Sequence, residues 1–117
     1  MMRASVIDRL ALSIVAVTLL LPASAGAQDT KAIAHGQEVY NAQKCSMCHS
    51  IAGKGNKLSP LDKVGAKLSA DDIRKWITDP AGMATGAKPK VPPMPKKWAA
   101  LPAADLDALV AFMQSLK

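Results

Sequence analysis

The segment Cys45-Ser46-Met47-Cys48-His49 constrains this chain more than any other stretch. Its two cysteines stand three positions apart, and a histidine follows the second one directly. Residues three and four apart lie on the same face of a helical turn. The segment can therefore present two thiols and one imidazole in the same direction.

Cys-x-x-Cys-His is the pattern to which haem c is attached. The two thiols can bond to the two vinyl groups of one porphyrin, while the imidazole reaches the iron as an axial ligand. We therefore expect one covalently bound haem c with its iron. In this interpretation Cys45 and Cys48 attach the haem, and His49 is a metal ligand.

Three other uses of these residues fit the sequence less well. A zinc site could combine Cys45, Cys48 and His49 with His35, but structural zinc usually takes a second ligand pair at finger-like spacing. A thioredoxin-like dithiol needs a strand-helix-strand context, and no strand is indicated nearby. A disulfide between two such close cysteines would close a very small loop and stabilise little.

The first 27 residues have the pattern of a secretory signal peptide. Arg3 and Arg9 precede an apolar run from Leu10 to Leu21, and small residues follow, with cleavage expected after Ala27 or alternatively after Ala25. The run is shorter than the ~20 residues of a spanning helix, so an uncleaved anchor is the less favoured alternative. Export would place the thiols outside the reducing cytoplasm, and we expect a periplasmic protein.

Residues 28–117 are expected to form one domain with little apolar material of its own. Leu, Ile, Val and Phe make up only 16 of these 90 residues. That share is below the roughly 20% at which chains struggle to bury a core. We expect the haem to be the largest apolar body in the interior and the apoprotein to fold poorly.

The pattern predicts a helix from Asp29 or Thr30 to about Lys44, a second one capped by Ser69 that ends before Pro80, and a last one from about Pro102. Residues 50–68 are expected to form loops and short turns. Residues 80–102 contain six prolines, so we expect neither helix nor central strand there. Gly36 lies inside the first helix, which indicates that another helix crosses it closely.

Met94 lies in the stiffest part of that proline-rich segment, Val91-Pro92-Pro93-Met94-Pro95. A thioether can fill the sixth position of a haem iron and raise its potential, so Met94 is the expected distal ligand. Met83 and His35 are the alternatives, and an open position is a third. Trp76 and Trp98 are expected to pack at the haem edge, where an indole N–H could also reach a propionate.

Taken in order, these pieces resemble a class I monohaem cytochrome c of the small exported bacterial kind, over residues 31–117. The resemblance is carried by Gly36 to Tyr40, by Cys45 to His49, by Met94-Pro95 and by Leu109 to Phe112. It implies an all-α cytochrome c fold with three to four helices around one haem, and with the terminal helices crossing at the glycine.

The family usually carries Gly-Pro-x-Leu after the haem motif, and the proline carbonyl accepts the proton of the proximal histidine. This chain instead reads Leu58-Ser59-Pro60-Leu61. Either Pro60 or Ser59 could supply that carbonyl, and some such partner is expected.

The expected function is outer-sphere electron transfer by a protein that is not an enzyme. The alternatives are a haem c subunit of a larger oxidoreductase, or a haem sensor or peroxidase-like protein with an open sixth position. Residues 28–117 carry 13 basic and 8 acidic side chains, a net charge of +5, and lysines flank both ligand segments. We expect acidic redox protein partners, no nucleic acid, no membrane span after signal cleavage, and a monomer or a subunit of a redox complex.

Overall fold

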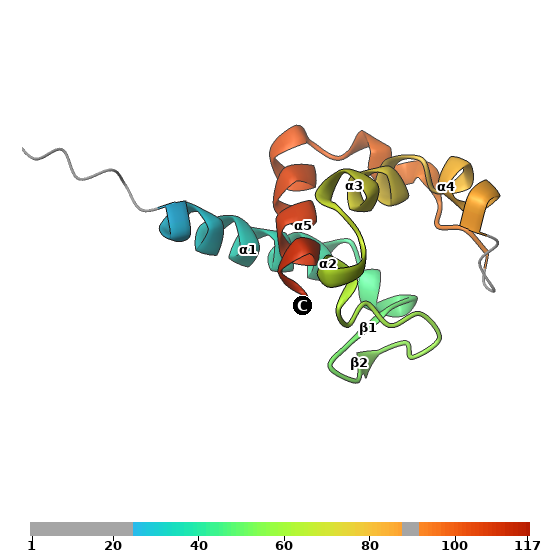
Figure 1. Cartoon of the computed structure of the whole chain (residues 1–117), viewed down its shortest axis with the longest axis horizontal. Coiled ribbons are helices and arrows are strands. Elements are labelled where there is room, and N and C mark those ends of the chain that lie inside the picture. Colours follow the sequence, from blue (N-terminus) through green and yellow to red (C-terminus); the bar gives the residue numbers. More distant parts are fainter. Residues whose placement is uncertain (1–24, 88–91) are drawn as a thin grey trace, which may run out of the picture.

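Two helices from opposite ends of the described chain cross each other and carry the core (Figure 1). They are α1 (Ala25–Ala42) and α5 (Ala103–Ser115), in a computed structural model that describes residues 25–87 and 92–117. Gly36 of α1 lies at the crossing, where an added Cβ would collide with the carbonyl oxygen of Ala108. The close approach of a second helix at Gly36 is therefore confirmed.

Helix α1 begins earlier and ends earlier than the sequence suggested. It starts at Ala25 rather than at Asp29 or Thr30, and alanine is the strongest helix former. It ends at Ala42, and Lys44 turns the chain with a left-handed φ of 56°. Both expected cleavage points fall at the start of α1, and residues 1–24 of the expected signal peptide lie outside the described residues.

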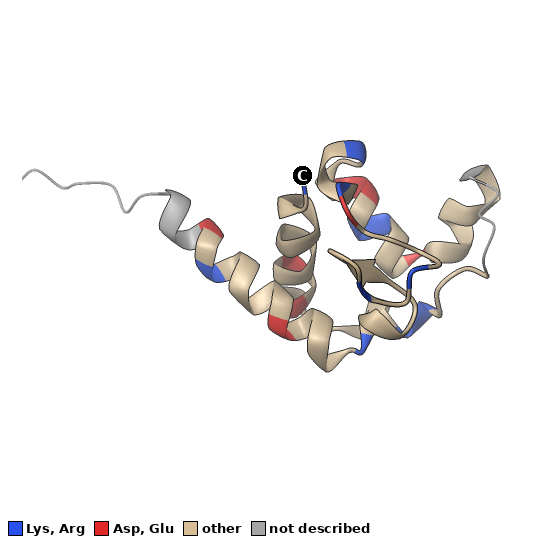
Figure 2. Ribbon diagram, turned by 90° about the horizontal axis from the view of Figure 1, so that it is seen from below, with Lys and Arg blue, Asp and Glu red and all other residues tan. Residues whose placement is uncertain are grey.

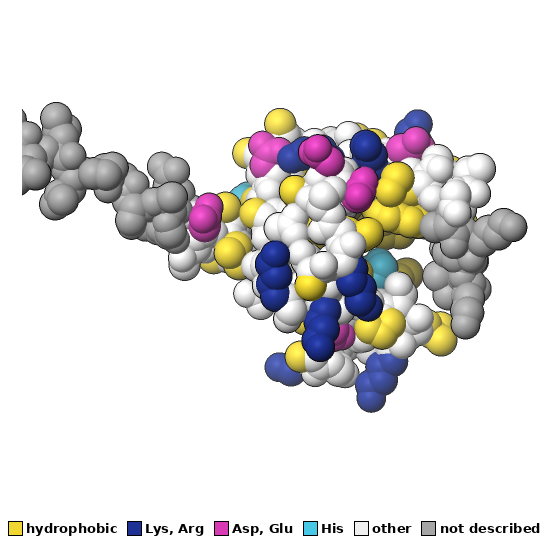
Figure 3. All heavy atoms as spheres, viewed as in Figure 1, with side chains coloured by type: hydrophobic (Ala, Val, Ile, Leu, Met, Phe, Trp, Pro, Cys, Tyr) yellow, Lys and Arg dark blue, Asp and Glu magenta, His cyan; other side chains and the backbone are white. Residues whose placement is uncertain are grey.

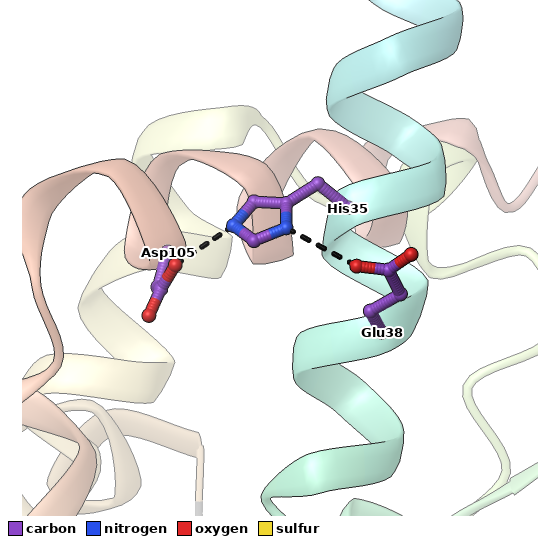
Figure 4. Close-up of polar contacts among 3 residues, drawn as sticks. All are labelled: His35, Glu38 and Asp105. Carbon is purple, nitrogen blue, oxygen red and sulfur yellow. Dashed lines mark hydrogen bonds and ion pairs between the residues drawn. The ribbon is translucent and has the colours of Figure 1, made fainter.

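A histidine joins α1 to α5 on the surface (Figure 4). His35 Nε2 lies 2.7 Å from Asp105 Oδ1 on α5, and His35 Nδ1 lies 3.5 Å from Glu38 Oε2 one turn further along α1. The hydrogen bond to Asp105, assisted by the one to Glu38, raises the pKa of the exposed His35 imidazole. Asp105 thus lies in the first turn of α5 and also pairs with α1.

The segment after the cysteines contains more regular structure than the expected loops. A small antiparallel hairpin joins β1 (Ser50–Ile51) to β2 (Lys54–Gly55). Its two turn residues, Ala52 and Gly53, both have positive φ, as a two-residue type I′ turn requires. The 3-10 helix η1 (Cys45–Met47) precedes the hairpin, and the short helix α2 (Val64–Lys67) follows it.

Helix α3 (Ala70–Thr78) has the predicted start and end. The Ser69 side chain accepts a hydrogen bond from the backbone N–H of Asp72, so the predicted cap is confirmed. Ile73 and Ile77 are buried. The Arg74 guanidinium donates to Asp107 of α5 at 2.5 Å, which ties α3 to that helix.

The prediction that residues 80–102 contain no helix is wrong. Helix α4 (Pro80–Ala87) begins on a proline. The first helical position tolerates proline because its missing N–H has no partner there, and the Asp79 carboxylate accepts from the backbone N–H of Gly82 at 3.3 Å. The 3-10 helix η2 (Lys96–Ala100) follows Met94, and α5 begins directly after Pro102.

The buried core lies where α1, α3 and α5 meet. Its members are Val39, Tyr40, Ile73, Ile77, Leu109, Val110, Phe112 and Met113. The rings of Tyr40 and Phe112 pack edge to face, with centroids 5.7 Å apart, beside the helix crossing. Within the described ranges, no helix is both long and apolar enough to cross a membrane.

Candidate haem site

An apolar cavity of about 570 Å³ opens beside α3 and α5, next to the cysteine motif. Figure 3 shows hydrophobic side chains gathered around a hollow in the surface. Carbon-rich walls with a few polar groups are typical of cofactor sites. The cavity is lined by Lys44, Cys45, Cys48, His49, Asn56, Leu58, Ser59, Leu61, Val64, Leu68, Ile73, Trp76, Ile77, Pro92, Pro93, Met94, Pro95, Trp98, Leu109 and Met113.

The two cysteines lie at one edge of this cavity as free thiols. The backbone N–H groups of Cys48 and His49 both donate to the carbonyl oxygen of Cys45, at 3.2 and 3.0 Å. This single helical turn brings the three side chains to the cavity, as the spacing predicted. Cys45 is half-buried, and burial raises the pKa of its thiol.

His49 is held by a hydrogen bond from Nδ1 to the carbonyl oxygen of Ser59, at 3.0 Å. A proton on Nδ1 leaves the lone pair on Nε2, which is the arrangement of a metal-binding histidine whose other nitrogen is fixed by a carbonyl. Of the two carbonyls considered from the sequence, Ser59 therefore makes the contact. Pro60, expected as a cofactor-binding residue, is exposed and is not part of the cavity lining.

Residues 45–61, which we call the proximal wall, are joined by many hydrogen bonds around Asn56. Its backbone N–H donates to the carbonyl oxygens of Ser46 and His49, each at 3.0 Å. Its side-chain amide donates to Met47 O at 3.1 Å and accepts from Leu58 N at 3.0 Å. Asn56 thus connects the haem motif to the loop that carries Ser59.

Residues 92–101, which we call the distal wall, bring Met94 to the same cavity. Met94 is half-buried, and Pro92, Pro93 and Pro95 line the cavity beside it. Met83 belongs to α4 and is not among the lining residues. The structure therefore brings Met94, rather than Met83, together with His49 and the cysteines.

Both tryptophans line the cavity and are half-buried. The Trp98 indole N–H donates to the Gln43 side-chain oxygen at 3.2 Å. Trp76 belongs to α3, between the buried Ile73 and Ile77.

His35 does not join this site. Its two ring nitrogens contact Asp105 and Glu38 at the α1–α5 crossing. It is therefore neither the fourth ligand of the zinc alternative nor an alternative iron ligand. Among the residues with described positions, no three His, Cys, Asp or Glu side chains are grouped as a metal site would require.

Comparison with known proteins shows the family of the chain. The family model described as Cytochrome c matches residues 33–117. The chain belongs to the cytochrome c family. The small size of this cytochrome fits class I, and the five α-helices of its described part, with little sheet, are consistent with the family fold.

The cytochrome is also similar to a curated relative, cytochrome c oxidase subunit 2 of Alkalihalophilus pseudofirmus, with 27% identity over 92 residues. The match covers 70% of this chain and 25% of the relative, so the chain spans about a quarter of that protein's length. No solved structure matches the chain.

Membership of the family means that this cytochrome binds haem c covalently and takes part in haem-based electron transfer. The residues present fit that group. Both cysteines and His49 of the attachment motif meet at one edge of an apolar cavity that also contains a thioether. The bound haem supplies an iron that changes between ferric and ferrous, and the protein supplies its orientation and surroundings.

Sequence reasoning did not find the roles of Asn56 and Gln43. Asparagine in a glycine-rich loop often bonds to nearby backbone groups, so Gly53, Gly55 and Asn56 together carried a usable signal. Gln43 carried none, because its partner Trp98 is distant in the sequence.

Proposed function

We propose that this cytochrome is a periplasmic one-electron carrier whose haem iron is held by His49 and Met94. The transfer is outer-sphere, so no substrate bond is made or broken and the protein is not an enzyme. Two protein ligands close the iron, which then cannot bind peroxide or oxygen. The observation that carries the proposal is that His49 and Met94, from segments distant in the sequence, line one cavity together with both cysteines.

The ligation is tested by spectroscopy of the haem-loaded protein. Methionine ligation gives a weak far-red absorption band in the ferric form of this family, and the ferrous form should bind carbon monoxide poorly. Met94→Ala should abolish the band and admit carbon monoxide. Met83→Ala is the matched control, since Met83 does not line the cavity, and it should leave the band in place. A band that survives in Met94→Ala would disprove the ligation.

The charge distribution supports acidic redox partners. In Figure 2 basic positions lie both on loops and on helices, whereas most acidic positions lie on helices. Six exposed lysines outside the α-helices lie in or beside the two walls: Lys44, Lys54, Lys57, Lys63, Lys96 and Lys97. Lys88 and Lys90, also expected there, lie outside the described residues. Met47, with 69% of its surface exposed, marks the proposed port for electrons near the cysteine motif.

This steering is tested through the rate of electron exchange with an acidic redox protein at increasing ionic strength. The rate should fall as salt screens the attraction. Lys57→Gln and Lys97→Gln should slow the exchange at low salt, and Lys31→Gln on α1 is the control that should not. A rate that does not depend on ionic strength would disprove the steering.

The periplasmic location is supported by the signal pattern of the first 27 residues. Cell fractionation should recover the haem protein in the periplasm, with a mature N-terminus at Gln28 or Gly26. A haem protein that retains Met1 and stays with the membrane would instead indicate an uncleaved anchor.

A second candidate function is that of an electron-transfer subunit in a larger oxidoreductase. It is favoured by the similarity to part of a protein whose name is cytochrome c oxidase subunit 2. Gentle purification separates the two functions. A free carrier should elute as a monomer, whereas a subunit should elute with an oxidoreductase.

A further inference from the structure

The distal wall makes few hydrogen bonds to the rest of the protein. Among the described residues, one hydrogen bond joins residues 92–101 to another element, from Trp98 Nε1 to Gln43 Oε1, at 3.2 Å. The sequence explains why. Pro92, Pro93 and Pro95 have no backbone N–H, so three of the ten residues cannot donate to a neighbour.

This bond joins the distal wall to the short stretch between α1 and Cys45. Gln43 stands just after α1 and two residues before Cys45, while Trp98 stands in η2, four residues after Met94. Cys45, Met94 and Trp98 all line the cavity. The bond thus joins the residue two positions before Cys45 to the segment that carries the methionine.

The surroundings of the bond favour its persistence. Gln43 and Trp98 are both half-buried, so water competes for the two groups only in part. The Lys97 ammonium lies 4.7 Å from the centre of the Trp98 ring, a cation–π contact that helps to hold the indole. Apart from this bond the distal wall is held by packing, chiefly against α3.

We propose that the Gln43–Trp98 hydrogen bond is a latch that holds the distal wall closed and thereby sets how readily Met94 leaves the iron. The proposal rests on the His49 and Met94 ligation given above. Gln43 and Trp98 act through Met94 and are positioning residues. A bond made only in the closed arrangement favours that arrangement by its own net free energy, and losing it raises the open fraction.

The test measures how readily imidazole displaces Met94 in the ferric, haem-loaded protein. The displacement is monitored by the loss of the far-red band. Apparent imidazole affinity is proportional to the open fraction. Gln43→Met keeps the side-chain length but removes the acceptor, and we expect the affinity to rise about fivefold, the effect of one net hydrogen bond. Gln43→Glu keeps an acceptor for the indole and should stay near the wild type.

Trp98→Phe removes the donor and should raise the affinity in the same direction. The double variant Gln43→Met/Trp98→Phe should then exceed Trp98→Phe by little, because both changes remove one interaction. Additive effects in this cycle would overturn the latch. If Gln43 had a purely structural role, Gln43→Met would lower the unfolding free energy, and Gln43→Glu would not restore the wild-type imidazole affinity.

The outcomes separate the latch from the ligation on which it rests. If the wild type shows the band and imidazole displaces Met94 no more readily in Gln43→Met, the latch is wrong and the ligation stands. A wild-type protein without the band, or a band that persists in Met94→Ala, overturns the ligation and the latch with it.

Discussion

The two walls of the cavity are built in opposite ways. In the proximal wall, Asn56 alone takes part in hydrogen bonds with Ser46, Met47, His49 and Leu58. In the distal wall, residues 92–101 share one hydrogen bond with other described elements. The first wall is fixed by many polar contacts, and the second relies on prolines, packing and a single polar contact.

The difference matches the tasks of the two walls. The proximal wall must hold two covalent attachment points and one imidazole in fixed relative positions, which calls for redundant contacts. The distal wall positions one thioether. Its prolines lower the conformational entropy of the unfolded chain without adding contacts in the folded protein. Changes in the proximal wall should therefore lower the stability of the domain, and changes in the distal wall should alter ligand exchange.

The largest expected effect comes from removing the covalent attachment. Buried core residues, among them Ile73, Ile77, Leu109 and Met113, also form walls of the 570 Å³ cavity. A chain that cannot retain haem has too little apolar material to close around that space. The double variant Cys45→Ala/Cys48→Ala should lose most of its helical circular dichroism. Native helicity in that variant would show that the proximal wall and the core are stable without haem.

A large effect is also expected at Gly55 in the proximal hairpin. Gly55 has a φ of 104°, and an added Cβ would collide with the carbonyl oxygen of His49. Gly55→Ala combines a left-handed strain with overpacking, so we expect the unfolding free energy of the haem-loaded protein to fall by about 3 kcal/mol in denaturant titrations.

Gly53 offers the matched control in the same hairpin. Its φ is 77°, but nothing lies within 4 Å of an added Cβ. Gly53→Ala should cost only the strain of the left-handed conformation, about 1 kcal/mol. Equal losses for the two variants would mean that contact with His49 does not matter at Gly55.

A smaller effect is expected from Asn56. Asn56→Ala removes the side-chain bonds to Met47 O and Leu58 N, and should lower the unfolding free energy by about 1–2 kcal/mol. Asn41→Ala is the control: Asn41 is exposed on α1, and alanine favours a helix there. If both variants unfold at the wild-type denaturant concentration, Asn56 does not organise the proximal wall.

The sequence predicted features that depend on nearby residues or on a steric requirement. The spacing of Cys45 to His49 fixes a single turn, and a glycine inside a helix indicates a close neighbour, so the haem motif and the crossing at Gly36 were predictable. The Ser69 cap was predictable for the same reason.

Features that depend on distant contacts were not predictable. Ser59, rather than Pro60, meets His49 because the bridge between Ser50 and Pro60 sets the register of the returning loop. Six prolines suggested a segment without helix, but Pro80 occupies the one helical turn that tolerates it, next to the capping Asp79. No sequence pattern joins Gln43 to Trp98.

The smallest expected effect lies outside both walls, at His35. Its pKa is raised in the folded protein, chiefly by the hydrogen bond to Asp105 and then by Glu38. The stabilisation is therefore complete below the unfolded value of about 6.5 and is lost as the pH rises through the raised folded value. Urea titrations at a series of pH values should show wild-type stability falling across that window, while His35→Gln shows a flatter dependence. The far-red band of both proteins should remain, since the α1–α5 crossing is separate from the two walls. If the unfolding free energy of His35→Gln falls with pH as steeply as that of the wild type, the pH dependence belongs to another group.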